Sequence, residues 1–356
     1  MTKDLRRAED YARSLGLSVP IMLAPMAGVP APSLSIEVAK AGGMGACGVL
    51  FMRADEIADW VATCRAAGAD ALQLNTWTPQ PAPPRDAAQE KAIRDYLSQW
   101  GPEVAADAGD STPPDFSAQC EAMLAARPTA ISSIMGLFPA DYVARLKAAG
   151  IKWFATATTV AEAKAAASAG ADAVIAQGSE AGGHRGAFDA RYADETMIGL
   201  FALLPAIVDA VDIPVIAAGG VADARGVAAA LALGASATMI GTAFLRCPEA
   251  ALQSGWADAL ARAQPEDTIV TRAFSGRPGR SLATEYARAA ASADAPFPAP
   301  YPVQRGLTAA MRAAAAKTND VSRMQAWAGQ AARLAPARPA AAVVETLWRG
   351  AQDILK

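Results

Sequence analysis

The stretch AAASAGADAVIAQ, residues 165–177, contains the pattern that decides the fold. Its alanine-rich first half is typical of a helix, and Gly170 stands where a helix end commonly needs a left-handed residue. After a short link the sequence continues as an apolar run without strict alternation, as expected of a parallel strand buried on both faces. The stretch therefore predicts a helix, a tight turn and a buried strand.

The same unit recurs along the chain. CRAAGADALQLN (64–75) and ALALGASATMIG (230–241) repeat it, and RLKAAGIKWFATAT (145–158) does so with a shorter link. Eight such strand–helix units predict an α/β fold of the (β/α)8 TIM barrel type, with a doubly wound open sheet as the alternative because counting cannot show closure. The predicted strands are 20–26, 44–50, 71–77, 130–136, 152–158, 173–179, 214–220 and 237–245, and the predicted helices are 32–42, 54–67, 119–127, 140–149, 159–169, 197–211 and 223–233.

Two parts of the chain fall outside the repeat. An insertion at 78–118 follows the third strand and is proline-rich at both ends, and the chain beyond the eighth strand is mostly alanine-rich helix. We predict a TIM-barrel domain over 1–245 that contains the insertion, a smaller helical substrate or lid domain over 246–325 and a C-terminal segment over 326–356 that returns to the barrel. The insertion and the smaller domain can form a lid, and the last helix, 339–354, can return to the barrel as its closing helix.

Composition and charge exclude several classes of protein. The 32 basic and 35 acidic side chains give a net charge of −3 without a basic run, so nothing favours nucleic acid as a partner. The 20 residues 226–245 carry no charge, but Gly234 interrupts them and favours helix, turn and strand over a membrane span. We predict a soluble, cytoplasmic protein without a membrane partner, as a monomer or a homodimer, whose four separated cysteines are reduced.

One glycine motif is misleading. Gly43, Gly45 and Gly48 match the GxGxxG fingerprint of dinucleotide-binding proteins. That fingerprint follows a strand and opens a helix, whereas here it follows a predicted helix and enters a strand. We therefore reject a Rossmann-type site.

A more convincing anion site lies near the end of the repeat. The seventh strand ends in AAGGVAD (217–223) and the eighth in MIGTAF (239–244). Glycines after strands 7 and 8 let backbone N–H groups approach a phosphate, and the N-terminus of the following helix adds a favourable dipole. The alternative is that both are ordinary tight turns.

The single histidine, His184, stands in the glycine-rich loop of AQGSEAGGHRG after the sixth strand. No second histidine or cysteine is near enough for a metal site, and no GxSxG motif provides a nucleophilic serine. This leaves a general acid or base, or a hydrogen-bond donor to an anionic substrate, with a purely structural histidine as the alternative. Asn75 and Gln177 end the third and sixth strands and offer neutral donors and acceptors to a heterocyclic ring, or satisfy local backbone groups.

Together these segments resemble the nitronate monooxygenase family, formerly called 2-nitropropane dioxygenases, and most of all its bacterial class I group. The resemblance runs from about residue 20 to 350, in the order LAPMAG, AKAGGMG, LQLNTW, AQGSEAGGHRG, PVIAAGGVAD, MIGTAF, SGRPGR (275–280) and WAGQ (327–330). It implies an FMN-binding TIM barrel with a smaller helical domain and no metal. The catalytic residue would be His184, and FMN would contact Ala24, Pro25, Met26, Asn75, Gln177, Gly182, Gly183, Gly219, Gly220, Met239, Ile240, Gly241 and Thr242.

Within this resemblance, Gly220 and 239–242 would hold the FMN phosphate, while Asn75 and Gln177 would lie near the isoalloxazine ring. The implied reaction is oxidation of alkyl nitronates, and of nitroalkanes where His184 removes a proton, by FMN and O₂ to carbonyl compounds and nitrite, as a detoxification. Relatives often carry histidines where this chain reads TWTPQP (76–81) and SSIMGLF (132–138), so the pocket is expected to be less polar. The alternatives are an FMN-dependent NAD(P)H:quinone or enoyl reductase, and a non-catalytic flavin- or anion-binding barrel.

Overall fold

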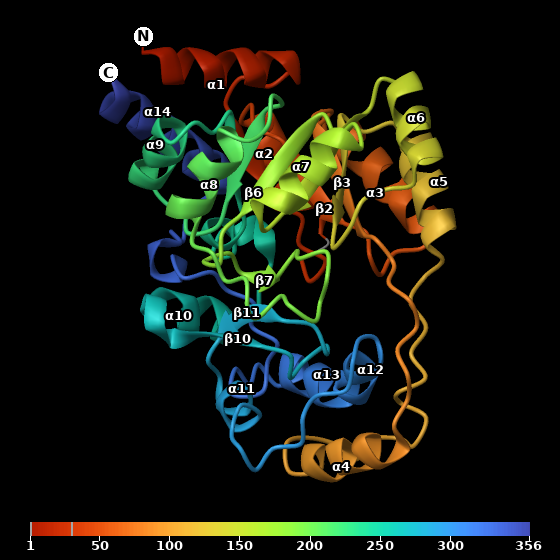
Figure 1. Ribbon diagram of the computed structural model, residues 1–356. Helices are drawn as coiled ribbons and strands as arrows, with labels where there is room; N and C mark the ends of the chain where they lie inside the picture. Colours follow the sequence, from red (N-terminus) through yellow and green to blue (C-terminus); the bar gives the residue numbers. More distant parts are fainter. Residues whose placement is uncertain (1, 30) are drawn as a thin grey trace.

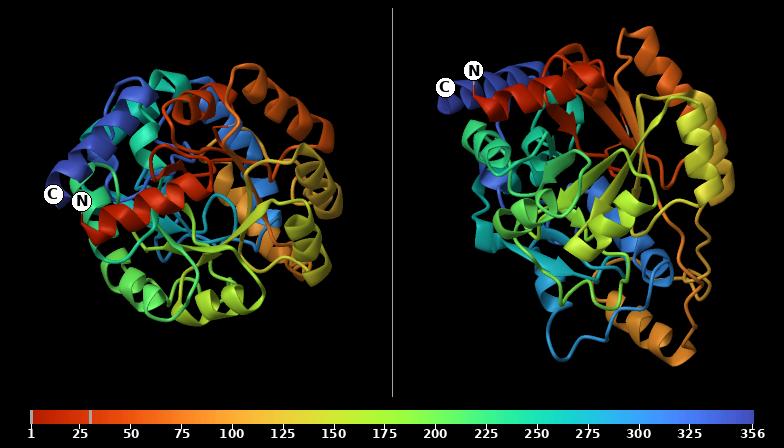
Figure 2. Two further views of the ribbon diagram at one scale, coloured as in Figure 1. Left: turned by 90° about the horizontal axis from the view of Figure 1, so that it is seen from above. Right: turned by 45° about the horizontal axis from the view of Figure 1, so that its top comes forward.

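Eight parallel strands form the barrel that the repeat predicts (Figures 1 and 2). The structure is a computed structural model that describes residues 2–29 and 31–356. Strand β1 pairs with β9 on one side, and its other side meets the segment before β2, where the Leu23 N–H donates to the Met44 carbonyl at 2.8 Å. The sheet is therefore closed, and the open-sheet alternative is wrong. The strands in spatial order are β1 (Ile21–Leu23), β9 (Ala237–Ile240), β8 (Val215–Ala218), β6 (Ala173–Gln177), β5 (Lys152–Ala157), β4 (Ala130–Ile134), β3 (Leu72–Trp77) and β2 (Gly45–Gly48).

The strands read as apolar runs because both of their faces are buried. One set of side chains, including Met22, Phe154 and Ile216, fills the inside of the barrel, and the other set packs against the surrounding helices. Viewed along the barrel axis, the helices form a ring around the strands (Figure 2). They are α2 (Pro32–Lys40), α3 (Ala54–Ala66), α5 (Phe116–Ala126), α6 (Ala140–Ala148), α7 (Val160–Ser168), α8 (Leu200–Val208), α9 (Ala224–Ala232) and α14 (Ala340–Leu355).

Helix α14 comes from the end of the chain and packs against α9 and α2 on the outside of the barrel. It thus occupies the place of the helix that would follow β9. Directly after β9 the chain instead forms a short 3₁₀ turn, η1 (Thr242–Phe244), where the sequence analysis had extended the strand to residue 245. Gly241 begins this change of direction with φ −110° and ψ −71°.

A helix that the sequence analysis did not predict closes the N-terminal end of the barrel. Helix α1 (Lys3–Ser14) lies across that end (Figure 2), and Ala12, Leu15 and Leu17 join the side chains inside the barrel. The Arg7 guanidinium group donates to the carbonyls of Leu231 and Ala235, which come just before β9.

A smaller lobe lies beyond the C-terminal ends of the strands (lower half of Figure 1). Besides helices it contains a three-stranded antiparallel sheet, which the expectation of a helical domain did not include. The insertion contributes one helix to this lobe, because Ile93 and Leu97 pack in one core with Phe274 and Leu307. Its elements are β7 (Gly183–His184), β10 (Thr268–Thr271), β11 (Gly279–Leu282), α4 (Ala87–Leu97), α10 (Ser254–Arg262), α11 (Glu285–Ala289), α12 (Val303–Leu307) and α13 (Ala309–Lys317).

The domain boundaries and the lid role of the insertion stay predictions. None of the helices in the described part of the chain is long and apolar enough to cross a membrane.

Candidate functional site

The short strand β7 connects the barrel to the smaller lobe and carries the single histidine. It leaves the end of β6 and pairs antiparallel with β11, so that His184 stands opposite Gly279 and Gly183 opposite Arg280. Gly183 has φ +76°, a left-handed conformation that suits glycine. The loop thereby places the imidazole at the carboxyl end of the barrel strands, where TIM-barrel enzymes carry their active sites.

Three side chains fix the His184 ring. Its Nε2 lies 2.8 Å from the Oγ of Ser275, a fully buried hydroxyl. The rings of Trp77 on β3 and Trp327 stand edge-on to it, with centroid distances of 4.7 and 4.8 Å. Such edge-to-face contacts orient a ring without using its polar atoms. The imidazole is therefore held in place while retaining hydrogen-bonding capacity.

The surroundings keep this imidazole neutral. Burial is the main cause, with Arg277, Arg305 and Arg312 adding repulsion, and together they lower the pKa of His184 to about 3. A neutral imidazole has one N–H donor and one unprotonated nitrogen. At neutral pH the group can donate a hydrogen bond to an anion, but it is a weak base.

Three arginines of the smaller lobe give the site a positive potential. Within residues 2–29 and 31–356, no carboxylate lies within 4.0 Å of the guanidinium groups of Arg277, Arg305 and Arg312. Arg277 lies over the Trp77 ring, 5.7 Å from its centroid, and Arg305 stacks on Phe51 at 3.6 Å. The arginines therefore face the barrel next to β2 and β3.

These arginines and the ring partners of His184 are not among the residues predicted from the sequence. Ser275 and Arg277 lie in SGRPGR, Trp77 in LQLNTW and Trp327 in WAGQ, all of which were quoted only as segments of a resemblance. For Trp77 the sequence did contain one indication of a place in the site, because this residue ends a barrel strand two residues after Asn75. Nothing in the sequence alone brings residues 275–327 next to residue 184.

The two predicted amides have partners within the protein. Gln177 holds both sides of the β7 loop, because its Nε2 donates to the His184 carbonyl at 3.0 Å and its Oε1 accepts from the Gly186 N–H at 2.8 Å. Asn75 donates through Nδ2 to the Oγ and the carbonyl oxygen of Ser132, at 2.8 and 3.2 Å. Both amides therefore have a structural role. A cofactor would contact them only through the hydrogen-bond donors and acceptors that these internal bonds leave free.

The predicted residues after β1, β8 and β9 lie on neighbouring strands, so the fold brings them together. The backbone N–H groups of Gly219, Gly220, Gly241 and Thr242 donate no hydrogen bond within the part of the chain that the structure describes. Gly219 and Gly220 have φ +113° and +70°, which turns the chain sharply at the end of β8. Unpaired N–H groups at the ends of two neighbouring strands fit an anionic group such as a phosphate.

Other residues that were predicted to bind the cofactor are less accessible to a ligand. The side chains of Met239 and Ile240 are buried on the inside and the outside of the barrel, so only their backbone can reach a ligand. The N-terminus of α9 is already capped, because the Asp223 carboxylate accepts from the Gly226 N–H at 3.0 Å. The anion site therefore depends on the turns after β8 and β9 rather than on the dipole of α9.

The segment WAGQ lies against these turns. The Gly329 N–H donates to Thr242 Oγ1 at 2.9 Å, and the Gln330 N–H donates to the Glu180 carbonyl at 3.0 Å. A side chain at Gly182 would lie 2.5 Å from the Gly329 nitrogen, so this close approach requires glycine. Ala24 and Met26 border the same area, since a side chain at Gly241 would lie 3.3 Å from Ala24 Cβ and 3.7 Å from Met26 Sδ.

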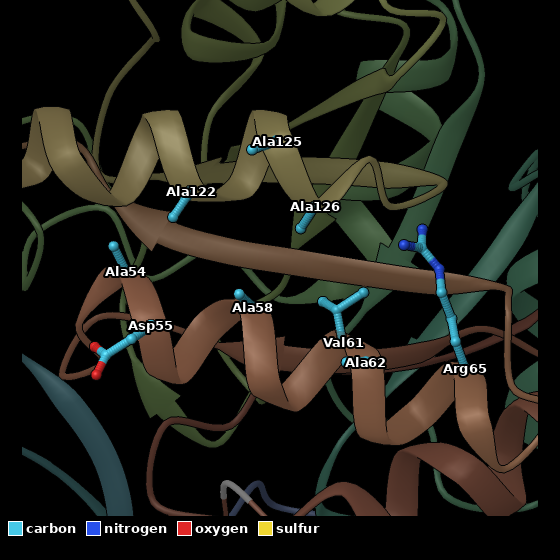
Figure 3. Close-up of a pocket in the computed structure, with 9 residues that line it drawn as sticks. All are labelled: Ala54, Asp55, Ala58, Val61, Ala62, Arg65, Ala122, Ala125 and Ala126. Carbon is cyan, nitrogen blue, oxygen red and sulfur yellow. The ribbon is translucent and has the colours of Figure 1, made fainter.

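A large surface groove lies elsewhere on the molecule. It has a volume of about 440 Å³ and runs between α3 and α5 on the outside of the barrel (Figure 3). Alanines form most of its lining, with Asp55 and Arg65 near its two ends. Asp55 already pairs with Arg53, and Arg65 donates to the carbonyl of Arg127. The groove offers no group suited to chemistry, so the candidate site is the one around His184.

Comparisons with known proteins identify the family of the chain. The family described as "Nitronate monooxygenase" matches residues 12–350. A nitronate monooxygenase of Paraburkholderia phytofirmans is 41% identical over 94% of this chain and 93% of its own length, and one of Pseudomonas aeruginosa is 36% identical over 95% and 97%. Among solved structures, a nitroalkane oxidase of Streptomyces ansochromogenes superposes with a TM-score of 0.89 at 36% identity, covering 97% of this chain and all of that one.

Proposed function

Because the chain belongs to the nitronate monooxygenase family, we propose that it oxidises alkyl nitronates with FMN and O₂ to carbonyl compounds and nitrite. The observation that carries the proposal is the neutral His184 imidazole, fixed by Ser275 and two tryptophans in a positive environment. A nitronate is an anion that already has its α-proton removed. Such a substrate needs a hydrogen-bond donor and positive potential, and both are present.

The same observation favours nitronates over neutral nitroalkanes. A general base works best when its pKa lies near the working pH, and the pKa of His184 is about 3. His184 is therefore too weak a base to remove the α-proton of a nitroalkane efficiently. Stabilisation of a bound anion needs no proton transfer, because the imidazole donates a hydrogen bond and Arg277, Arg305 and Arg312 supply charge.

The residues present fit an FMN cofactor. When bound, FMN would accept the electrons of the nitronate and pass them to O₂. The unpaired N–H groups of Gly219, Gly220, Gly241 and Thr242 would hold its phosphate. Ala24, Pro25 and Met26 would lie along the ring, with Asn75 and Gln177 near its polar edge, while Gly182 and Gly183 would keep the β7 loop close to it.

We place the enzyme in the cytoplasm, with nitronate detoxification as its role. Support comes from Cys47, Cys64, Cys120 and Cys247, which are all free and buried, as is usual in a reducing compartment. Light scattering on the purified protein distinguishes the monomer from the homodimer.

The test is the visible spectrum of the purified protein during anaerobic addition of an alkyl nitronate, with NADH added to a parallel sample. We expect nitronate to abolish the oxidised-flavin absorbance without a nicotinamide, and NADH to act slowly or not at all. The matched variant S275A removes the Nε2 partner of His184 and keeps the imidazole, so it should react more slowly but completely. Rapid bleaching by NADH together with no response to nitronate would assign the protein to the reductases instead.

A further inference from the structure

Two buried arginines of this protein differ in how their charge is satisfied. Arg185 is 5% exposed, and its two terminal nitrogens donate to the carbonyls of Gln177, Thr158 and Thr196, while its Nε alone has no partner among the described residues. Arg277 is 6% exposed, yet within the described residues its guanidinium group donates no hydrogen bond and forms no ion pair. A buried charge without a partner is costly, so such groups normally face a ligand or counterion.

Further positive charge lies close to Arg277. Arg305 on α12 likewise has no hydrogen bond or ion pair from its guanidinium group among the described residues. Arg312 on α13 donates to the backbone carbonyl of Arg305 at 2.8 Å, and the two guanidinium groups repel each other electrostatically. Burial, with repulsion from Arg305, lowers the pKa of Arg312 to about 10, and burial lowers that of Arg277 to about 10. All three remain charged at neutral pH. Asp189 acts on Arg277 through space but pairs with Arg191, and among the described residues no carboxylate forms an ion pair with any of the three.

Aromatic rings hold the two unpaired guanidinium groups and leave their N–H edges free. Arg277 lies over Trp77 and Arg305 over Phe51, both from the barrel. Tyr301 packs against Trp77 with a centroid distance of 5.0 Å, and burial raises the pKa of its phenol. Guanidinium groups stacked on rings still present pairs of parallel N–H donors at their edges, which match the two oxygens of a planar anion.

We propose that Arg277 and Arg305, supported by Arg312, form a subsite for a small planar inorganic oxyanion such as nitrate or nitrite. This subsite is separate from the N–H groups after β8 and β9 that would hold the FMN phosphate. The inference deepens the proposed function, in which the same arginines stabilise the anionic substrate, by naming the class of anion that they bind in the absence of that substrate. If the proposed reaction holds, its product nitrite binds there and slows turnover by competing with the anionic substrate.

The experiment is calorimetric titration of the flavin-loaded protein with sodium nitrate at constant ionic strength, with sodium chloride as the comparison. We expect saturable binding of nitrate and weaker binding of chloride, which cannot accept two parallel hydrogen bonds. The variants R277Q and R305Q should each weaken nitrate binding about ten-fold or more, since a charge-assisted hydrogen bond contributes more than the 1.4 kcal/mol that corresponds to ten-fold.

Two further variants keep the result interpretable. R277K preserves the charge and removes the planar fork, so it should bind nitrate more weakly than the wild type and more tightly than R277Q. Arg145 on α6 is an exposed arginine paired with Glu121 on α5 at 2.6 Å, and R145Q should leave the dissociation constant unchanged. Flavin content and circular dichroism show whether each variant is folded.

Several outcomes would overturn the proposal. They are the absence of saturable nitrate binding to the wild type, equal affinity for chloride and nitrate, and an unchanged dissociation constant in both R277Q and R305Q. The titration contains no nitronate, so its result is independent of the proposed reaction. A protein that binds nitrate through these arginines but does not oxidise nitronates would retain the subsite and lose the proposed function.

Discussion

At the N-terminal ends of the barrel strands, helix α1 lies across the opening, and apolar side chains such as Leu15, Met22 and Phe154 fill the space beneath it. At the C-terminal ends, the turns leave backbone N–H groups unpaired, and the smaller lobe adds His184 and three arginines without carboxylate partners. One end consists of close-packed and mostly apolar groups, although the buried Tyr11 hydroxyl on α1 has no hydrogen-bond partner among the described residues. The other end retains several charged and backbone N–H groups that a ligand would satisfy. Residues that stabilise the barrel and residues that are available for a reaction therefore lie at opposite ends of the same strands.

The largest effect should follow from removing the imidazole at the C-terminal end. H184N keeps a hydrogen-bonding side chain of similar size but loses the aromatic ring between Trp77 and Trp327. We expect kcat/KM for an alkyl nitronate to fall about 10²–10⁴-fold, the range typical for loss of a positioned acid–base or donor group, with FMN content unchanged. Steady-state oxygen consumption measures this. Unchanged kinetics would show that His184 has no role in the reaction, and the assignment of the reaction to the C-terminal end of the barrel would lose its main support.

The matching change at the N-terminal end should affect stability alone. F154A removes a fully buried ring from the inside of the barrel and leaves a cavity. We expect the free energy of unfolding to fall by about 3–5 kcal/mol. Urea denaturation measures the loss, and kcat/KM per folded enzyme should stay close to that of the wild type. A large fall in kcat/KM at a temperature where the variant is folded would show that the two ends are coupled.

The sequence predicted the barrel well because each strand–helix unit carries a local signal. Gly170 ends α7 with φ +92°, and the apolar run after it is the buried strand β6. The same signal, a glycine between an alanine-rich helix and an apolar strand, recurs at Gly68 and Gly234. The prediction of strands and helices therefore needed no long-range information.

The smaller lobe and α1 lacked such a signal. Strands β10 and β11 are four residues each and are joined by residues 272–278, RAFSGRP, so neither strand is long enough to show a clear period. Helix α1 is charged on its exposed face, and its apolar residues Leu5, Ala8 and Ala12 become meaningful only when the barrel end beneath them is known.

The candidate site was predicted only where its residues stand in the strand-end turns. His184, Gln177 and the glycines after β8 could be named because the barrel pattern places their positions at one end. Ser275, Arg277 and Arg305 reach the site through the packing of the smaller lobe, whose contacts join residues far apart in sequence. Spacing along the chain contains no information on such contacts.

A smaller effect should come from the link between β9 and the C-terminal segment. T242V removes the oxygen that accepts from the Gly329 N–H at 2.9 Å and keeps the shape of the side chain. A buried donor left without a partner costs about 1–3 kcal/mol, so we expect weaker FMN binding and a lower melting temperature. Fluorescence titration of the apoprotein with FMN measures the dissociation constant. T346V, which changes an exposed threonine on α14, is the control and should alter neither quantity.

The smallest expected effect is the dependence of stability on pH through His184. Its pKa is lowered to about 3 in the folded protein from the ordinary value of 6.5, mainly by burial and then by the three arginines. Between these two values the unfolded chain binds a proton that the folded protein does not, so His184 makes stability rise with pH. The slope is at most about 1.4 kcal/mol per pH unit and disappears above pH 6.5, because the imidazole is then neutral in both states. Urea denaturation of the wild type and H184N between pH 5 and 8 isolates this contribution, since other groups cancel in the difference. An identical pH dependence in the two proteins would mean that the imidazole is not kept neutral in the folded protein. The C-terminal end of the barrel would then accommodate a protonated His184 beside its three arginines, and the argument that this end is built to bind an anion would fail.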